Sequence, residues 1–258
     1  MSRALHAEWT KLRTLHANGW LLLATVALFI ALSAVVTLAL HYSSGGHGQD
    51  ITKLSLAGIY IGQAIVAILA VVSICSEYST GMIAVTLTAI PRRASMLAAK
   101  AITLTGLVVA AATLAVLGSM LASRLVLPGH GFTPAHGYAV LSLTHALTLR
   151  AAGGSVLYLA LIALLSLGVA TAVREAAVAV GIVLGLLYLF PILAALVTDP
   201  SLRRHLQQIA PMNAGLAIQD TTNLRHLPIA PWAGLGVLAA WAAVSLIVGA
   251  LLLHFRDA

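Results

Sequence analysis

Charged residues are scarce in this chain of 258 residues: 8% are Asp, Glu, Lys or Arg, whereas 60% are hydrophobic. A water-soluble domain carries about a quarter charged residues, because its surface must face water. The mean hydropathy of +1.01 points the same way. The composition therefore excludes a soluble globular domain and is typical of an integral membrane protein.

Negative charge is the scarcer sign, with 7 Asp and Glu against 14 Lys and Arg, so the formal net charge is +7. This excess does not indicate nucleic-acid binding, because the basic residues form no stripe with interleaved aromatic residues. They lie at the ends of apolar runs, where cations meet lipid phosphates. We therefore expect membrane lipids as their partners, and no nucleic acid.

Cysteine is also scarce, and the common catalytic motifs are missing. The single cysteine, Cys75, has no partner for a disulfide or a metal site, so we interpret it as a small buried apolar residue. The chain contains neither the G-x-x-x-x-G-K-[ST] loop that binds ATP nor the H-E-x-x-H motif of zinc proteases. The 10 histidines show no spacing that would gather several around one metal ion. We assign no catalytic residue, no metal site and no cofactor to this chain.

Long apolar runs are what the sequence has instead. A helix needs about 20 apolar residues to cross the hydrocarbon layer, and unpaired backbone groups are not tolerated there. We predict an all-α integral membrane protein, a single transmembrane domain over 1–258 with six transmembrane helices. The predicted spans are residues 20–40, 57–75, 97–122, 152–173, 176–197 and 232–253.

Six spans place both termini on one side, and the positions of Lys and Arg indicate which side. Of the 14 basic residues, eight fall on the side of the termini, in short segments near span ends. This bias predicts cytoplasmic termini. The eight are Arg3, Lys11, Arg13, Arg92, Arg93, Lys100, Arg174 and Arg256; the others are Lys53, Arg124, Arg150, Arg203, Arg204 and Arg225.

The connections on the opposite, outer side are long: 41–56, 123–151 and 198–231. The last two contain apolar patterns interrupted by Pro and Gly, such as "LQQIAPMNAGLAIQ". Loops of this length are usually functional or disordered, and the apolar content argues against disorder. We therefore predict short interfacial or re-entrant helices, with a re-entrant segment over 198–231.

The first residues, 1–19, predict an interfacial helix ahead of span one. Its apolar residues share one face, with a Trp at headgroup depth, while its charged residues can reach water. A simple anchor that orients span one is the alternative. The apolar set is Leu5, Trp9 and Leu12, and the charged set is Glu8, Lys11 and Arg13.

A half-apolar segment, 76–95, joins predicted spans two and three and contains "EYSTGMIAVTLTAIPRR". Charges at both of its ends predict that it stays at the cytoplasmic surface, with Glu77 exposed. We therefore expect loss of the Glu77 carboxylate to cost less than about 1 kcal/mol. Between the charges, a short helix with one apolar face is predicted, which a proline ends. The apolar face consists of Ile83, Leu87 and Ile90, and the proline is Pro91.

Small and polar residues inside the spans predict helix contacts. Gly58 and Gly62 in span two, and Gly181 and Gly185 in span five, are spaced by four, which permits close packing within the bundle or against another copy. Gln63 is the most polar residue well inside a span. It is either a candidate for the substrate pathway or the partner in an interhelical hydrogen bond. The near absence of ionisable residues in the spans disfavours a proton-driven carrier.

Three stretches, "AEWTKLRT", "EYSTGMIAVTLTAIPRRASMLAAK" and "APMNAG", resemble the membrane subunit of ABC-2-type exporters. The resemblance follows the six-span layout, and its most specific part is the Glu-x-x-x-Gly stretch with Pro-Arg-Arg and Lys100 behind it. It implies a non-enzymatic permease subunit of the bacterial cytoplasmic membrane. Its partners would be two copies of an ATP-binding cassette ATPase, which bind ATP and Mg, and a second permease copy or homologue. The substrate is expected to be hydrophobic or amphipathic.

The resemblance also implies roles for particular residues. The segment between spans two and three would be a coupling helix that docks on the ATPase, beside the interfacial helix, and an outer segment would gate the exit. A membrane-embedded enzyme and a non-transporting scaffold or immunity protein stay open as alternatives. The implied coupling residues are Glu77, Tyr78, Thr80, Gly81, Met82, Thr86, Leu87, Arg92 and Arg93, and the implied gate residues are Pro211, Asn213 and Gly215.

Overall fold

A computed structural model describes residues 16–39, 49–82, 93–132 and 145–255, with side chains from residue 22 onward. Within these residues, six helices are long and apolar enough to cross a membrane, and no strand occurs. The predicted all-α fold with six spans is therefore confirmed. The six helices are α2 (His16–Ala39), α4 (Ile59–Ser79), α6 (Arg93–Val126), α7 (Ala146–Val173), α8 (Ala176–Leu196) and α11 (Pro231–Phe255).

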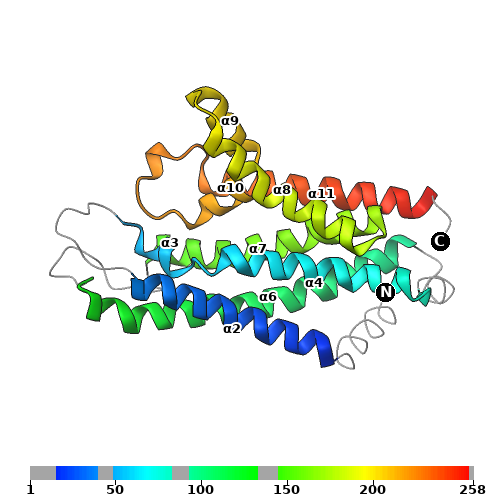
Figure 1. Ribbon diagram of the computed structural model, residues 1–258, viewed down its shortest axis with the longest axis horizontal. Helices are drawn as coiled ribbons and strands as arrows, with labels where there is room; N and C mark the ends of the chain where they lie inside the picture. Colours follow the sequence, from blue (N-terminus) through cyan, green and yellow to red (C-terminus); the bar gives the residue numbers. More distant parts are fainter. Residues whose placement is uncertain (1–15, 40–48, 83–92, 133–144, 256–258) are drawn as a thin grey trace.

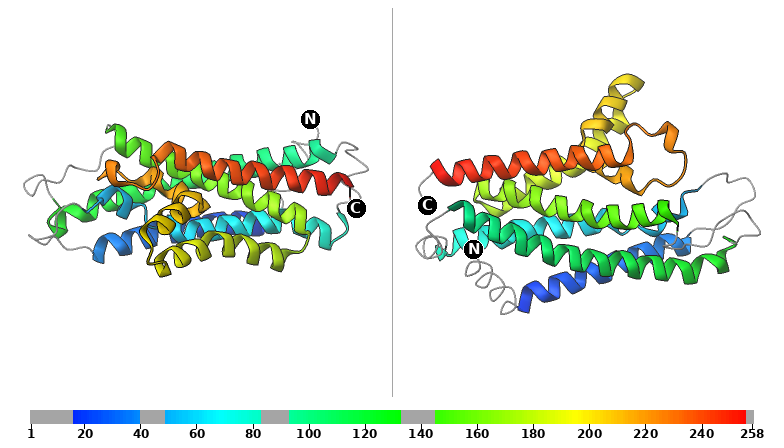
Figure 2. Two further views of the ribbon diagram at one scale, coloured as in Figure 1. Left: turned by 90° about the horizontal axis from the view of Figure 1, so that it is seen from above. Right: turned by 180° about the vertical axis from the view of Figure 1, so that it is seen from behind.

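The six helices run side by side along the long axis of the molecule (Figures 1 and 2). We call the end at which α2 begins and α11 ends the terminal end, and the opposite end the loop end. α4 and α6 meet at the terminal end, as do α7 and α8. That the terminal end faces the cytoplasm stays a prediction. The predicted interfacial-helix residues, Leu5 to Arg13, lie outside the described residues.

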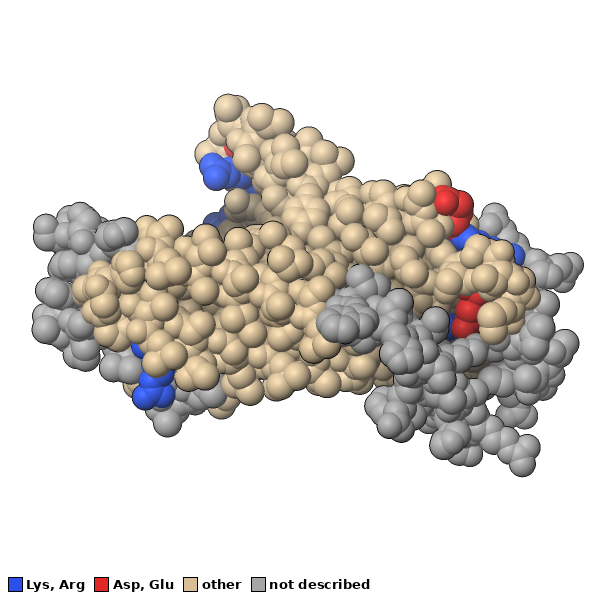
Figure 3. All heavy atoms as spheres, turned by 60° about the horizontal axis from the view of Figure 1, so that its bottom comes forward, with Lys and Arg blue, Asp and Glu red and all other residues tan. Residues whose placement is uncertain are grey.

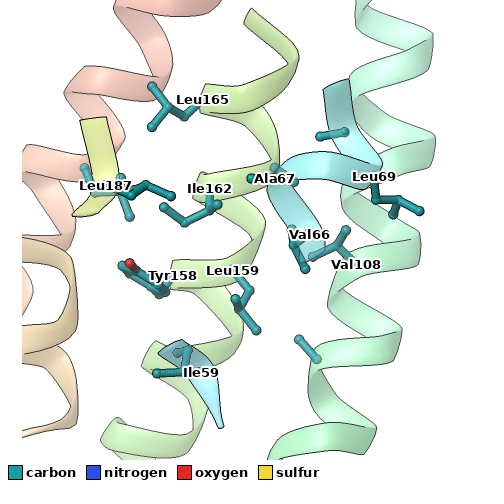
Figure 4. Packing of buried hydrophobic residues seen from close by; sticks show 14 of the residues in the cluster. Ile59, Val66, Ala67, Leu69, Val108, Tyr158, Leu159, Ile162, Leu165 and Leu187 are labelled. Atoms are coloured by element: carbon teal, nitrogen blue, oxygen red, sulfur yellow. The ribbon is translucent and has the colours of Figure 1, made fainter. Parts of the chain in front are cut away.

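α7 lies at the centre of the bundle, in contact with α4, α6, α8 and α11. More than half of the apolar windows of α7 and α4 is buried, 61% and 56%, against 28% or less in the other four helices. Figure 4 shows Ile162 of α7 among side chains from three neighbouring helices, including Val66, Val108 and Leu187. Close packing holds such helices together, because lipid tails are as apolar as the side chains.

Charged side chains gather away from the middle of the molecule. On the face that Figure 3 shows, the visible Lys, Arg, Asp and Glu side chains lie at the two ends and on a projection, and other residues form the surface between them. Exposed leucines and valines, among them Leu114 and Val248, supply apolar surface on the spans. This distribution suits a bundle whose middle faces hydrocarbon and whose ends face water.

The loop end carries the short elements. Among the described residues, segment 198–231 contains two α-helices, where the sequence predicts interfacial or re-entrant helices. α10 is buried except for Asn213, whereas no residue of α9 is buried and α9 projects from the bundle (Figure 1). The elements are α3 (Ile51–Ser55), η1 (Leu127–His130), α9 (Pro200–Ile209), α10 (Pro211–Leu216), η3 (Ala217–Gln219) and η4 (Leu224–His226).

α9 is an amphipathic helix with a capped start. Asp199 accepts hydrogen bonds from the Ser201 hydroxyl and backbone N–H, each at 2.8 Å, and these bonds hold the pKa of the Asp199 carboxyl below its usual value. Leu202 and Ile209 are exposed, as are the charged residues Arg203 and Arg204. An exposed apolar face beside basic residues is the pattern of a helix that lies in a membrane interface.

Candidate coupling site at the terminal end

A buried ion pair joins α4 to α6 near the terminal end. Glu77 Oε1 in the last turn of α4 lies 2.9 Å from Lys100 Nζ of α6, and the two side chains are 8% and 5% exposed. Lys100 also donates a hydrogen bond to the Ser73 carbonyl oxygen at 3.0 Å. Opposite charges that are both withdrawn from water hold each other firmly, because removing either one leaves the other without compensation.

The burial of Glu77 corrects the sequence-based expectation of an exposed carboxylate. α4 continues to Ser79, past the predicted end of span two, because no helix-breaking residue occurs before Gly81. The last turn of α4 therefore packs against α6 and carries Glu77 into the bundle. Burial is tolerated because Lys100 faces it. The reason for expecting a cost below about 1 kcal/mol is therefore lost, and for a buried ion pair we predict a larger cost.

Two arginines bind the last turn of α11. Arg93 at the start of α6 donates to the Leu253 carbonyl oxygen at 2.6 Å, and Arg174 between α7 and α8 donates to the Leu252 carbonyl oxygen at 3.5 Å. The last four carbonyl groups of a helix lack intrahelical partners and carry partial negative charge. The guanidinium groups satisfy two of these carbonyls and connect α6 and the α7–α8 turn to α11.

The turn between α7 and α8 places Arg174 against α4. Arg174 ends α7 in the left-handed conformation, with φ at 65°, and its guanidinium carbon lies 5.3 Å from the centre of the Tyr78 ring. That distance allows a cation–π interaction. Glu175 caps α8 by accepting hydrogen bonds from the N–H groups of Ala177 at 3.0 Å and Val178 at 2.6 Å. The turn thereby touches the residue that follows Glu77.

The remaining implied coupling residues fall into two groups. Thr80, Gly81 and Met82 are exposed just beyond α4, and Gly81 has φ at +69°, a conformation that suits glycine. Thr86, Leu87 and Arg92 lie outside the described residues, as does the predicted apolar face formed with Ile83 and Ile90. The described part of segment 76–95 therefore places Glu77 inside the bundle and the next exposed residues at its surface.

The architecture and this site define a multi-pass membrane protein whose helices are joined by ion pairs and capping bonds at one end. The chain belongs to a family of transmembrane permease components: residues 4–192 match the ABC-2 family transporter protein family, over more than half of the chain. Membrane proteins of this family generally work with an ATP-binding cassette ATPase. A comparison with curated proteins finds no match.

Gly58 and Gly62 lie against α2. A β-carbon on Gly58 would lie 2.1 Å from the Phe29 carbonyl oxygen, and one on Gly62 would lie 2.7 Å from the Phe29 ring. The Gly58 N–H also donates to the Ser33 hydroxyl at 2.9 Å. These two glycines therefore allow α2 and α4 to approach closely within the bundle.

Gly181 and Gly185 of α8 have different surroundings. Apart from the neighbouring residues and the backbone of α8 itself, no described atom would lie within 4 Å of a β-carbon at either position. Their spacing accordingly serves no close helix approach among the described residues. Contact with another copy, the second interpretation of that spacing, stays a prediction.

Gln63 is fully buried between α7 and α10. The Tyr158 hydroxyl of α7 donates to its amide oxygen, and its amide nitrogen lies 3.3 Å from the sulfur of Met212 in α10. Nearby, Gln219 donates to the Ser155 hydroxyl at 2.8 Å. These contacts favour the interhelical hydrogen bond over the pathway as the role of Gln63.

The implied gate residues are all in α10 but differ in their surroundings. Pro211 begins the helix and is buried. Gly215 packs on Tyr158, because a β-carbon there would lie 2.6 Å from the ring. Asn213 is half-buried and lines a cavity of about 330 Å³. The three residues therefore place α10 between the Tyr158 side of the bundle core and this cavity.

Sequence reasoning missed a polar cluster at the loop end. Lys53 Nζ lies 2.6 Å from Asp220 Oδ1, and Arg150 donates to the Asp220 backbone carbonyl. Asp50 caps α3 at the Lys53 N–H, at 3.0 Å, and accepts from the Thr221 hydroxyl at 2.7 Å. The cluster joins α3 to the segment before α11. Its sequence signal was Asp50 and Asp220, two of the seven acidic residues of the chain, both in loop-end connections.

Metal ligands do not gather in the described parts of the chain. Within residues 16–39, 49–82, 93–132 and 145–255, no group of three or more His, Cys, Asp or Glu residues could hold a metal ion. Cys75 is buried, as expected of a small apolar residue.

Proposed function

We propose that this chain is the permease subunit of an ATP-binding cassette exporter. It would move a hydrophobic or amphipathic substrate across the bacterial cytoplasmic membrane while separate ATPase subunits hydrolyse ATP. Membership of the ABC-2 family and the six apolar helices support this function. Two ATPase copies would bind the ATP and Mg, and a second permease copy or a homologue would complete the transporter.

The observation that carries the proposal is the buried ion pair between Glu77 and Lys100. The residues that would dock on the ATPase begin with Glu77 itself and continue at the surface with Thr80, Gly81 and Met82. Because separating a buried ion pair costs several kcal/mol, about 3–5, a force on these residues would move α4 and α6 together. The bonds from Arg93 and Arg174 would pass the movement on to α11. α4, α6 and α11 would therefore move together at the terminal end.

The distribution of charge supports the substrate class. Among the described residues, Asp, Glu, Lys and Arg lie near the helix ends, so the middle of the bundle offers no side-chain charge to a permeating ion. An ion would lose its hydration there without compensating ligands. An apolar or amphipathic substrate meets no such barrier.

The test pairs one exposed residue at each end of the bundle. Met82 is 48% exposed beyond α4, and Leu224 is 37% exposed at the loop end. The chain is co-expressed with a P-loop ATPase of the ATP-binding cassette type and purified through a tag on the permease. Met82→Asp should lower the amount of ATPase recovered, because the charge enters an apolar docking surface, whereas Leu224→Asp should not.

Two outcomes would contradict the proposal, and they are distinguishable. Equal recovery of the ATPase with both variants would show that the ATPase does not dock at the terminal end. Absence of any ATPase from the wild-type preparation, together with no ATP-dependent transport in vesicles, would contradict the exporter function itself.

A further inference from the structure

A cavity of about 330 Å³ lies at the loop end, and α3, α4, α8, α9, α10 and the segment before α11 contribute to its wall. This volume falls within the range of about 300–1,000 Å³ that is usual for small-molecule sites. The lining combines apolar with polar side chains. The apolar ones include Pro191, Met212 and Leu216, and the polar ones include Lys53, Gln207 and Asp220.

Two amide side chains in this wall are uncommitted. Gln207 of α9 and Asn213 of α10 are half-buried, and neither side chain forms a hydrogen bond with the described residues. The adjacent Gln208, by contrast, donates to the Pro228 carbonyl oxygen at 2.7 Å. Because both side chains line the cavity, their amides offer donors and acceptors to a molecule in it.

A fixed pair of opposite charges forms another part of the wall. Lys53 and Asp220 are 2.6 Å apart, with side chains 36% and 14% exposed, so neither is sealed inside the protein. Arg150 holds the Asp220 backbone, and Asp50 holds both α3 and Thr221. An ammonium and a carboxylate held side by side complement a head group that carries both charges.

We propose that this cavity binds a zwitterionic amphiphile whose head carries an acidic group and a primary ammonium. The acid faces Lys53, the ammonium donates to Asp220, and the alkyl chain lies against the apolar lining. The amides of Gln207 and Asn213 bind the remaining polar atoms of the head. A simple anion would meet the Asp220 carboxylate, and a simple cation would meet Lys53, so both are disfavoured.

This inference goes beyond the proposed function, because binding requires neither ATP nor an ATPase. Two sources supply the same chemistry: a membrane phospholipid with an ethanolamine head, and a free lysolipid with that head. The purified chain is therefore tested alone, in nanodiscs made of phosphatidylcholine. The probe is lysophosphatidylethanolamine with a photoactivatable acyl chain, and the readout is labelling of peptides that line the cavity.

Competition measures the head-group preference. Unlabelled lysophosphatidylethanolamine should displace the probe. Lysophosphatidylcholine has no N–H group to donate to Asp220, and lysophosphatidylglycerol has no ammonium. Each should compete about fivefold more weakly, which corresponds to one lost hydrogen bond.

Variants of the lining residues test whether the probe binds in this cavity. Gln207→Leu and Lys53→Met should each weaken labelling by about fivefold or more. Arg124→Met is the matched control, because it removes an exposed loop-end cation that does not line the cavity. Gln207→Leu breaks no hydrogen bond among the described residues, so an unchanged thermal unfolding midpoint separates loss of binding from loss of fold.

The two sources are separated by changing the bilayer. In nanodiscs of phosphatidylethanolamine, labelling should fall without added competitor if a membrane lipid occupies the cavity, and should stay unchanged if only the free lysolipid enters. Either result supports the site. Equal competition by the three head groups, or labelling that neither Gln207→Leu nor Lys53→Met alters, would overturn it.

Discussion

Lys100 of α6 bridges two turns of α4: its ammonium binds Glu77 Oε1 at 2.9 Å and the Ser73 carbonyl oxygen at 3.0 Å. Glu77 lies in the last turn of α4 and Lys100 near the start of α6, so the ion pair joins these two helices from inside the bundle. A buried cation of this kind is stable only beside its partners. The contact between α4 and α6 is therefore specified by charge as well as by shape.

The ion pair can be tested with a double-mutant cycle. Glu77→Gln alone should destabilise the protein by about 3–5 kcal/mol, because the Lys100 charge would lose its carboxylate in a buried site. The double variant Glu77→Gln/Lys100→Met should be more stable than Glu77→Gln, since no buried charge is left. Thermal unfolding in one detergent gives the values, with the exposed Arg124→Met within about 0.5 kcal/mol of wild type as control. The stability losses of Glu77→Gln and Lys100→Met are also measured singly. If their sum equals the loss of the double variant, the pairing is contradicted.

The glycine contacts give a matched comparison between two helices. Gly58→Ala should cost about 1–3 kcal/mol, because the new methyl group would press on the Phe29 backbone and separate α2 from α4. Gly181→Ala should cause no loss and can add up to about 1 kcal/mol through helix propensity. Unfolding of both variants under the same conditions measures the difference. Equal stabilities would show that α2 does not need the small residue.

The buried amide of Gln63 should behave as a structural group. Gln63→Leu removes the acceptor of the Tyr158 hydroxyl, so a loss of about 1–3 kcal/mol is expected, and adding Tyr158→Phe should restore part of it. Transport of several hydrophobic compounds should keep the same order of preference. A changed order in a Gln63→Leu protein that inserts and binds the ATPase normally would instead place this residue on the substrate pathway.

Cysteine labelling can establish the orientation. In a Cys75→Ala background, an impermeant thiol reagent added to intact cells should label cysteines at Ser201 and Leu224, which are exposed at the loop end. A cysteine at Thr80, exposed at the terminal end, should react only after permeabilisation. This expected orientation rests on the excess of Lys and Arg near the terminal-end connections. Labelling of Thr80→Cys in intact cells would reverse the assignment.

The six helices could be predicted from the sequence because their apolar runs are long enough to have one interpretation. Their ends could not. Predicted span two stops at residue 75, yet α4 continues to Ser79, and α7 begins at Ala146, six residues before predicted span four. Hydropathy reports which residues suit lipid, whereas a helix continues until a residue such as Gly81 breaks it.

The polar contacts could not be predicted from the sequence for a different reason. Glu77 and Lys100 are 23 positions apart, and Asp50 and Thr221 are 171 apart, so no local spacing connects them. The coupling role of segment 76–95 came from a family resemblance, and the burial of Glu77 required the packed structure. A usable signal was nevertheless present: where charges are rare, each one near a span end needs a partner.

The bonds from Arg93 and Arg174 to the last turn of α11 bear on the order of biosynthesis. α6, α7 and α8 leave the ribosome before α11, so both guanidinium groups enter the membrane region before the Leu252 and Leu253 carbonyls exist. α11 therefore forms these contacts last, after α6 and the α7–α8 turn have been synthesised. A nascent chain interrupted ahead of α11 would therefore lack both of these connections at its terminal end.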